Sequence, residues 1–139
     1  MTIYALSSGS GVSGIAVIRV SGKNTAEVIK RLTGSSLPQP RVATLKKFNK
    51  NGQKQLIDEG VVLWFPGPNS YTGEDLAEFH VHGSRAVINA MHSAISKIKN
   101  CRLAEPGEFT KRALLNDKLT ILEAESINDI ISAETENQR

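Results

Sequence analysis

Residues 70–84, SYTGEDLAEFHVHGS, restrict the possible fold more than any other part of the chain. Residues 76–82 have the alternation of a strand, in which successive side chains point to opposite faces of a sheet. One face would consist of Ala77, Phe79 and Val81, and the other of Leu76, Glu78, His80 and His82. Only the first face is suited to a hydrophobic core. The sequence therefore predicts a sheet whose second face carries ionisable groups.

A second polar segment, AEPGEFTKRALLNDKL at residues 104–119, gathers charged side chains around one short helix. Pro106 and Glu108 suit the first turn of that helix, and Asn116 suits its C-terminal end. An amphipathic helix at residues 84–100 separates the two polar segments. We expect the segments to meet by tertiary contact and to close a site.

The remaining pattern predicts helices packed on a sheet. Strands are expected at residues 2–6, 15–20, 42–48 and 57–65, and helices at residues 24–32, 106–115 and from Thr120 onward. Glycine turns are expected at residues 9–14 and at Asn51-Gly52, the latter within a hairpin. The last helix would expose an apolar stripe of Ala124, Ile127, Ile130 and Ile131, which predicts some self-association.

The composition, with 40% hydrophobic and 22% charged residues, is typical of a globular protein rather than a disordered one. No apolar run approaches the roughly 20 residues of a membrane-spanning helix, and the N-terminus lacks the features of a secretory signal. A single cysteine, Cys101, excludes an intramolecular disulfide and a CxxC pair. We expect an intracellular protein in which Cys101 is a core residue.

The net charge is +3, and residues 1–120 contain 16 of the 17 Lys and Arg residues. Lys46, Lys47, Lys50 and Lys54 form a basic segment that could attract an anionic ligand or nucleic acid. Aromatic residues make up only 5% of the chain and do not alternate with the basic ones. An ordinary solvated surface is therefore an equally good interpretation of these lysines.

Glu78, His80 and His82 could together ligate a divalent metal, because alternate strand residues point the same way. The alternative interpretation is that both histidines are hydrogen-bonded residues at the end of a strand. A phosphate loop of the form GxxxxGK followed by Ser or Thr is absent, so this chain should not hydrolyse a nucleotide.

A half-buried carboxylate such as Glu78 could instead accept paired N–H donors from the amino-amidine edge of a pterin. Arg19, a charge within an apolar strand, and Lys118 would then be available for the carboxylates of the same ligand. The alternative is that Arg19 and Glu78 pair with each other across adjacent strands.

Four segments resemble a known family in order and spacing. They are TIYALS, SGIAVIRVSG, FPGPNSYTGEDLAEFHVHGS and AEPGEFTKRALLNDKLTILEAESINDII, and together they span nearly the whole chain. They resemble the N-terminal part of the tRNA-modification GTPases known as MnmE or TrmE. The chain departs from the family pattern in the glycine turn and at Gly83-Ser84, where Ser84 could cap the following helix.

The resemblance implies an α+β fold, a mixed β-sheet with packed helices, similar to the tetrahydrofolate-binding domain of the glycine-cleavage aminomethyltransferase. Residues 1–118 would form a folate-binding and homodimerising domain, and residues 119–139 the first helix of a truncated central helical domain. In the family, that helical domain is interrupted by a Ras-like domain that binds GTP, Mg²⁺ and K⁺. This chain lacks that domain and should not be catalytic alone.

Family members act with the flavoprotein MnmG on C5 of the wobble uridine of tRNA, taking a one-carbon unit from 5,10-methylene-tetrahydrofolate. By matched motif positions, the family's 5-formyl-tetrahydrofolate contacts correspond to Arg19, Glu78 and Lys118. No catalytic residue and no metal site is carried over. The implied location is the bacterial cytoplasm or the mitochondrial matrix, without membrane attachment. The alternative function is an interaction module for tRNA or the flavoprotein that does not bind folate.

Overall fold

The computed structural model describes residues 1–7, 14–50, 54–120 and 122–126. These residues form a mixed α+β fold around one six-stranded sheet. In chain order the elements are β1 (Thr2–Leu6), β2 (Ile15–Ser21), α1 (Thr25–Thr33), β3 (Thr44–Asn49), β4 (Leu56–Phe65), β5 (Leu76–His82), α2 (Arg85–Ser96), β6 (Cys101–Leu103) and α3 (Glu108–Leu115).

The strands lie in the order β3-β4-β5-β2-β1-β6. Neighbouring strands are antiparallel except β1 and β6, which are parallel. Strands β2 and β5 are central neighbours in the sheet, and their register places Arg19 directly opposite Glu78. The sheet topology thus brings together two charges that are far apart in the sequence.

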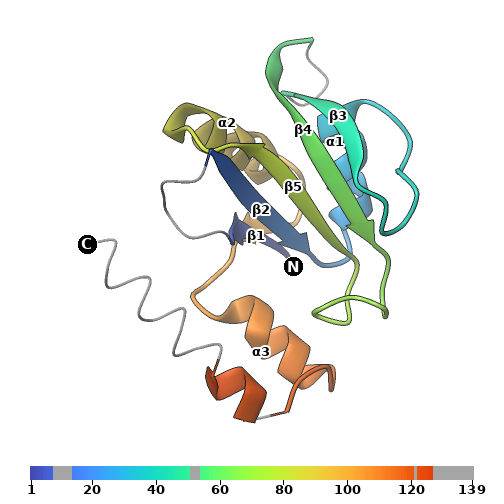
Figure 1. Cartoon of the computed structure of the whole chain (residues 1–139), viewed down its shortest axis with the longest axis vertical. Helices are drawn as coiled ribbons and strands as arrows, with labels where there is room; N and C mark the ends of the chain where they lie inside the picture. Colours follow the sequence, from blue (N-terminus) through green and yellow to red (C-terminus); the bar gives the residue numbers. More distant parts are fainter. Residues whose placement is uncertain (8–13, 51–53, 121, 127–139) are drawn as a thin grey trace.

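Helices α1 and α2 lie together on one face of the sheet, behind it in Figure 1. Their apolar residues are buried against the inward side chains of the strands, and Phe48 and Phe79 make an edge-to-face contact with ring centroids 5.4 Å apart. As predicted from the alternation in β5, Ala77, Phe79 and Val81 are buried on this face. The main hydrophobic core therefore lies between the sheet and these two helices.

The local helix signals act as expected. Gly34 ends α1 in a left-handed conformation (φ 65°), in which its N–H bonds to the carbonyl of Lys30. Ser84 caps α2 by accepting a hydrogen bond from the Val87 N–H, which confirms the predicted cap. Thr120 and Glu123 exchange the two hydrogen bonds of a capping box, and this confirms the start of the last helix.

Among the described residues, α3 and the loop of residues 66–75 cover one end of the opposite face of the sheet (Figure 1). Buried residues at this end include Ile3, Thr72, Leu76, Thr110 and Ala113. Leu76 is thus buried although it shares a face of β5 with the ionisable groups. No described helix or loop covers the rest of this face, which we call the open face.

Two sequence expectations are wrong, one is confirmed, and three fall outside the described residues. The helix predicted to reach residue 100 ends at Ser96, because the chain turns into the short strand β6, which has no periodic signal. Cys101 lies in β6 and is buried, which confirms it as a core residue. Ala124 is buried rather than exposed. The rest of its stripe (Ile127, Ile130 and Ile131), the Asn51-Gly52 turn and most of the turn at residues 9–14 fall outside the described residues.

Candidate functional site

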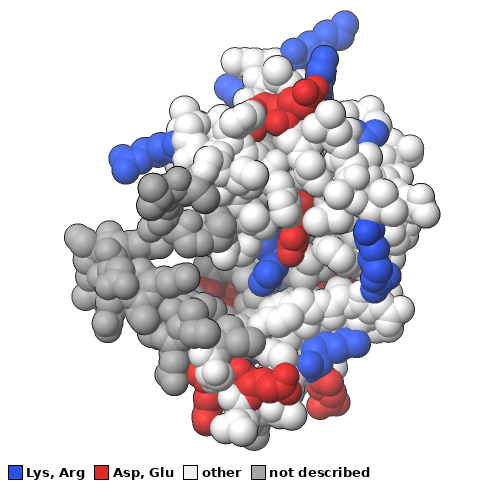
Figure 2. Space-filling model, in the orientation of Figure 1, with Lys and Arg blue, Asp and Glu red and all other residues white. Residues whose placement is uncertain are grey.

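Arg19 and Glu78 meet on the open face of the sheet, at the point where β2 and β5 lie side by side. Their side chains are 26% and 23% exposed, and Arg19 Nη2 lies 3.8 Å from Glu78 Oε2. Figure 2 shows basic and acidic side chains meeting at the centre of the face in view. This distance exceeds the length of a hydrogen bond, so the two residues form an ion pair without a direct hydrogen bond, which we call an open pair.

Arg19 also contacts two aromatic rings that the sequence did not single out. Its guanidinium carbon lies 5.1 Å from the ring centre of Tyr71 and 5.5 Å from that of Phe109, both within cation–π range. The Nε atom of Arg19 is buried and has no hydrogen-bond partner among the described residues. A buried N–H donor without a partner is rare.

Glu78 has its second neighbour on its own strand. Its Oε1 atom lies 3.1 Å from Nε2 of His80, which is itself half-buried. The carboxylate therefore has one oxygen shared with His80 and the other facing Arg19.

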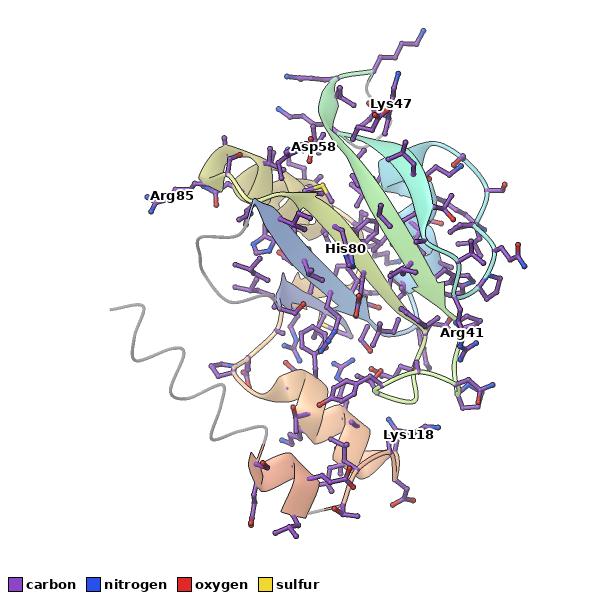
Figure 3. The ribbon with its side chains drawn as sticks, in the orientation of Figure 1. Arg41, Lys47, Asp58, His80, Arg85 and Lys118 are labelled. Carbon is purple, nitrogen blue, oxygen red and sulfur yellow. The ribbon has the colours of Figure 1, made fainter. Side chains whose placement is uncertain are left out.

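His82, two residues further along, belongs to a different pair. Its Nδ1 lies 2.8 Å from Asp58 Oδ1, and its backbone N–H donates to Asp58 Oδ2. Figure 3 shows Asp58 and His80 on this part of the sheet. His82 is thus the hydrogen-bonded strand-end residue of the alternative interpretation, and its contacts lower the pKa of Asp58 even though burial alone would raise it. No group of three metal-ligating side chains with suitable geometry occurs in the ranges that the structure describes.

Lys118 lies just beyond α3, where its backbone N–H bonds to the carbonyl of Ala113. Its Cε would be 3.3 Å from a Cβ atom added at Gly73, so its stem passes close to the loop of residues 66–75. Figure 3 places Lys118 at the edge of the molecule, whereas His80 lies over the sheet. Among the described residues, no hydrogen bond or ion pair joins Lys118 to Arg19 or Glu78. The structure therefore brings together two of the three predicted site residues.

The two polar segments meet, as the sequence predicted. Asn116 Nδ2 donates to the carbonyl of Thr72 at 2.8 Å, and the Tyr71 hydroxyl lies 3.1 Å from Thr110 Oγ1. These contacts join the loop of residues 66–75 to α3. Because Tyr71 and Phe109 come from these two elements, their junction determines where the aromatic contacts of Arg19 lie.

A chain of ion pairs fixes α3 against the sheet. Arg102 binds Glu108 at 2.6 Å, and Arg112 binds both Glu108, at 3.1 Å, and Glu74, at 3.0 Å. The hydrogen bonds from Arg102 are the main reason that the pKa of Glu108 falls from 4.5 to about 2. Glu74 also accepts a hydrogen bond from buried Ser21 at the end of β2. The helix that carries Phe109 is thereby connected to the strand that carries Arg19.

An apolar groove with a volume of about 430 Å³ lies next to the charged residues on the open face. It is lined by Ile15, Ala43, Glu59, Gly60, Val61, Leu63, His80, Val81 and His82. His80 therefore borders the groove on one side and Glu78 on the other.

The comparisons identify the family. The sequence model of the family described as GTP-binding protein TrmE N-terminus matches residues 2–118. This chain belongs to the TrmE N-terminal family. The match confirms the resemblance drawn from the sequence motifs.

Similar proteins cover this TrmE N-terminal chain from end to end. It is 69% identical over 139 residues to the tRNA modification GTPase MnmE of Pelagibacter ubique (strain HTCC1062), covering 100% of this chain and 31% of that protein. It is 53% identical over 138 residues to the mitochondrial 5-taurinomethyluridine-tRNA synthase subunit GTPB3 of Danio rerio, and this match covers 99% of this chain and 27% of that protein. The tRNA modification GTPase MnmE of Rhodopseudomonas palustris (strain BisB18) is 51% identical over 138 residues, and this match covers 99% of this chain and 30% of that protein. The TrmE N-terminal chain thus spans less than a third of the length of these relatives. In the ranges that the structure describes, no helix is long and apolar enough to cross a membrane.

Proposed function

We propose that this TrmE N-terminal domain binds a reduced folate of the 5-formyl-tetrahydrofolate type and forms a homodimer. The observation that carries the proposal is the half-buried Arg19 and Glu78 pair, whose charged atoms remain 3.8 Å apart. A ligand that offers both N–H donors and acceptor atoms can bind to both residues. The names of the relatives, which are tRNA-modifying proteins, support a role of the parent protein in tRNA modification.

The residues present suit a pterin. Glu78 Oε2 can accept one N–H of the pterin's amino-amidine edge, while Nη2 of Arg19, which faces Glu78, can donate to an acceptor atom of the ligand. Tyr71 and Phe109 add aromatic surface beside Arg19. Lys118, at the end of α3, would reach the carboxylates at the other end of an extended folate. When bound, the folate would supply the one-carbon unit, as 5,10-methylene-tetrahydrofolate, and this chain would hold and orient it.

We also propose where this domain lies in its parent protein and what the parent protein does. The family match ends at residue 118, which supports a folate-binding domain of residues 1–118 followed by the first helix of a helical domain at residues 119–139. The α+β fold with one mixed sheet is compatible with likeness to the folate domain of the aminomethyltransferase. The parent would be a GTPase that binds GTP, Mg²⁺ and K⁺ outside this chain. It would act with the flavoprotein MnmG on C5 of the tRNA wobble uridine, in the bacterial cytoplasm or the mitochondrial matrix.

The test is isothermal titration of the 139-residue chain with 5-formyl-tetrahydrofolate, combined with light scattering. We expect about one ligand per chain on a dimer. Glu78→Gln should weaken binding by at least about tenfold, because charge-assisted hydrogen bonds to the ligand are lost. Glu27→Gln, on the helix-covered face, is the matched control and should bind normally. A folded Glu78→Gln variant with unchanged affinity would overturn the folate assignment.

A second candidate function is an interaction module for tRNA or the flavoprotein. The supporting observation is the basic hairpin of β3 and β4, where Lys47, Lys50 and Lys54 are exposed; Figure 3 shows Lys47 at this end of the molecule. Replacing Lys46, Lys47, Lys50 and Lys54 by Gln should weaken tRNA binding and reduce its salt dependence by about one unit of slope for each phosphate that is no longer neutralised. Replacing Lys23, Lys30, Lys97 and Lys99 by Gln is the control, because it removes the same charge elsewhere on the molecule. Absence of salt-dependent tRNA binding would exclude the tRNA part of this function.

A further inference from the structure

Arg19 and Glu78 are held apart although nothing in the pairing of β2 and β5 requires it. They occupy directly opposite positions, yet Nη2 and Oε2 are 3.8 Å apart, whereas charge-assisted N–H···O bonds are about 2.7–2.9 Å long. Both side chains are about three-quarters buried, where electrostatic attraction is less screened than at the surface. An open pair in this setting implies that other contacts oppose its closure.

His80 supplies the opposing contact on the carboxylate side. Its Nε2 lies 3.1 Å from Glu78 Oε1, and both residues project from the same face of β5. The backbone of His80 is fixed in the sheet, because it pairs with β2 at Val17 and with β4 at Val61.

Two aromatic rings supply the contact on the guanidinium side. Arg19 lies over Tyr71 and Phe109, and each ring is attached to a fixed element. Tyr71 bonds to Thr110 on α3, and α3 is itself anchored through Arg112 and Glu74. The guanidinium is therefore stabilised at a position from which its buried Nε meets no acceptor in the part of the chain that the structure describes.

We propose that His80, Tyr71 and Phe109 are positioning residues that keep the Arg19 and Glu78 pair open for a ligand. A closed pair would satisfy both charges internally and would have to be broken before a ligand could bind. The open pair presents an acceptor oxygen and a donor nitrogen side by side, and so suits a planar group with adjacent donor and acceptor atoms. The ligand part of this inference rests on the proposed folate function; the open state of the pair does not.

The open state is tested without ligand by a double-variant cycle of Arg19→Met and Glu78→Gln, read by urea unfolding. The cycle measures the coupling between Arg19 and Glu78 as a factor in the unfolding equilibrium constant. In the wild-type background we expect this factor to be less than about twofold. With His80→Leu, Glu78 can turn to Arg19, and the coupling should rise to about fivefold. His80→Gln, whose amide can still donate to Glu78, should restore the low value. Equal coupling in the wild-type and His80→Leu backgrounds would overturn the proposal.

His82→Leu is the matched control, since His82 lies on the same strand and pairs with Asp58 instead of Glu78. It should leave the coupling unchanged. The aromatic side is tested in the same cycle with Tyr71→Leu and Phe109→Leu, which should raise the coupling, whereas Tyr71→Phe keeps the ring and should not. If neither Leu substitution changes the coupling, the rings do not position Arg19.

Titration with 5-formyl-tetrahydrofolate then tests the ligand part. We expect His80→Leu to bind about tenfold more weakly than wild type and His80→Gln to bind within about threefold of it. Unchanged affinity in His80→Leu would overturn the positioning role in binding. If the wild-type chain does not bind the folate, the proposed function fails, while the ligand-free cycle still decides whether His80 holds the pair open.

Discussion

Arg112 of α3 donates a 3.0 Å hydrogen bond to Glu74 of the loop that precedes β5. The same guanidinium also reaches Glu108 and the backbone carbonyl of Met1. Arg112 is only 15% exposed, so its charge is compensated by protein groups more than by water. One side chain thus connects α3, the loop of residues 66–75 and the N-terminal strand.

Arg112→Met should therefore destabilise the domain by about 2–3 kcal/mol, because it leaves two carboxylates with weakened partners. Urea unfolding monitored by circular dichroism measures this loss. Lys111→Met, at the exposed neighbouring position on α3, is the control and should change stability by less than about 0.5 kcal/mol. Equal stability of the two variants would show that the ion pairs do not anchor α3.

Glu108 makes the stability of the fold sensitive to acid. Its pKa is lowered from 4.5 to about 2 by hydrogen bonds from Arg102 and Arg112. A carboxyl group whose pKa is lower in the folded state stabilises the fold above its unfolded pKa, and this contribution is lost as the pH falls. Stability should decline between about pH 4.5 and pH 2, and the decline should be shallower in Glu108→Gln. Urea midpoints across this range provide the measurement, and parallel curves for the two proteins would contradict the assignment.

Much of this site was accessible from the sequence because charges inside apolar strands are conspicuous. The alternation of β5 predicted the burial of Ala77, Phe79 and Val81, although not that of Leu76. It also marked Glu78, like Arg19 in its own apolar strand, as a charge that a core does not require. The meeting of the two polar segments followed from the density of polar residues at both. These signals are local, so a linear pattern can reveal them.

The contacts that position the site were not predictable in the same way. Tyr71 lies in a loop and Phe109 in a short helix, and neither has a periodic pattern that indicates what its ring faces. The 3.8 Å gap between Arg19 and Glu78 depends on packing of the whole domain. The parallel strand β6 was also missed, because residues 101–103 are too few to show alternation.

His92 gives a second pH dependence, at higher pH. Its Nε2 atom is buried and has no hydrogen-bond partner within the described ranges, and its ring packs edge-to-face on Tyr4 at a centroid distance of 5.4 Å. Burial lowers the pKa of His92 from 6.5. Below pH 6.5 the unfolded chain binds a proton at this residue more readily than the folded one, so stability should fall as the pH drops. His92→Phe keeps an aromatic ring and should flatten this dependence. NMR titration of the histidine ring protons gives the direct test, and a His92 pKa at or above 6.5 would contradict it.

Gly60 on β4 allows the sheet to close tightly beside the candidate site. A Cβ atom there would lie 2.0 Å from the carbonyl oxygen of His80 and 3.2 Å from the Phe48 ring. Since one obstacle is backbone, Gly60→Ala should separate β4 from β5 and reduce stability by about 3 kcal/mol or more. Gly14→Ala, where a Cβ would meet nothing within 4 Å, is the matched control and should be nearly neutral. Urea unfolding compares the two variants, and a Gly60→Ala protein as stable as Gly14→Ala would show that the strands can yield. Because separating β4 from β5 would also disturb His80, which lies on β5, Gly60→Ala should weaken folate binding, whereas Gly14→Ala should not.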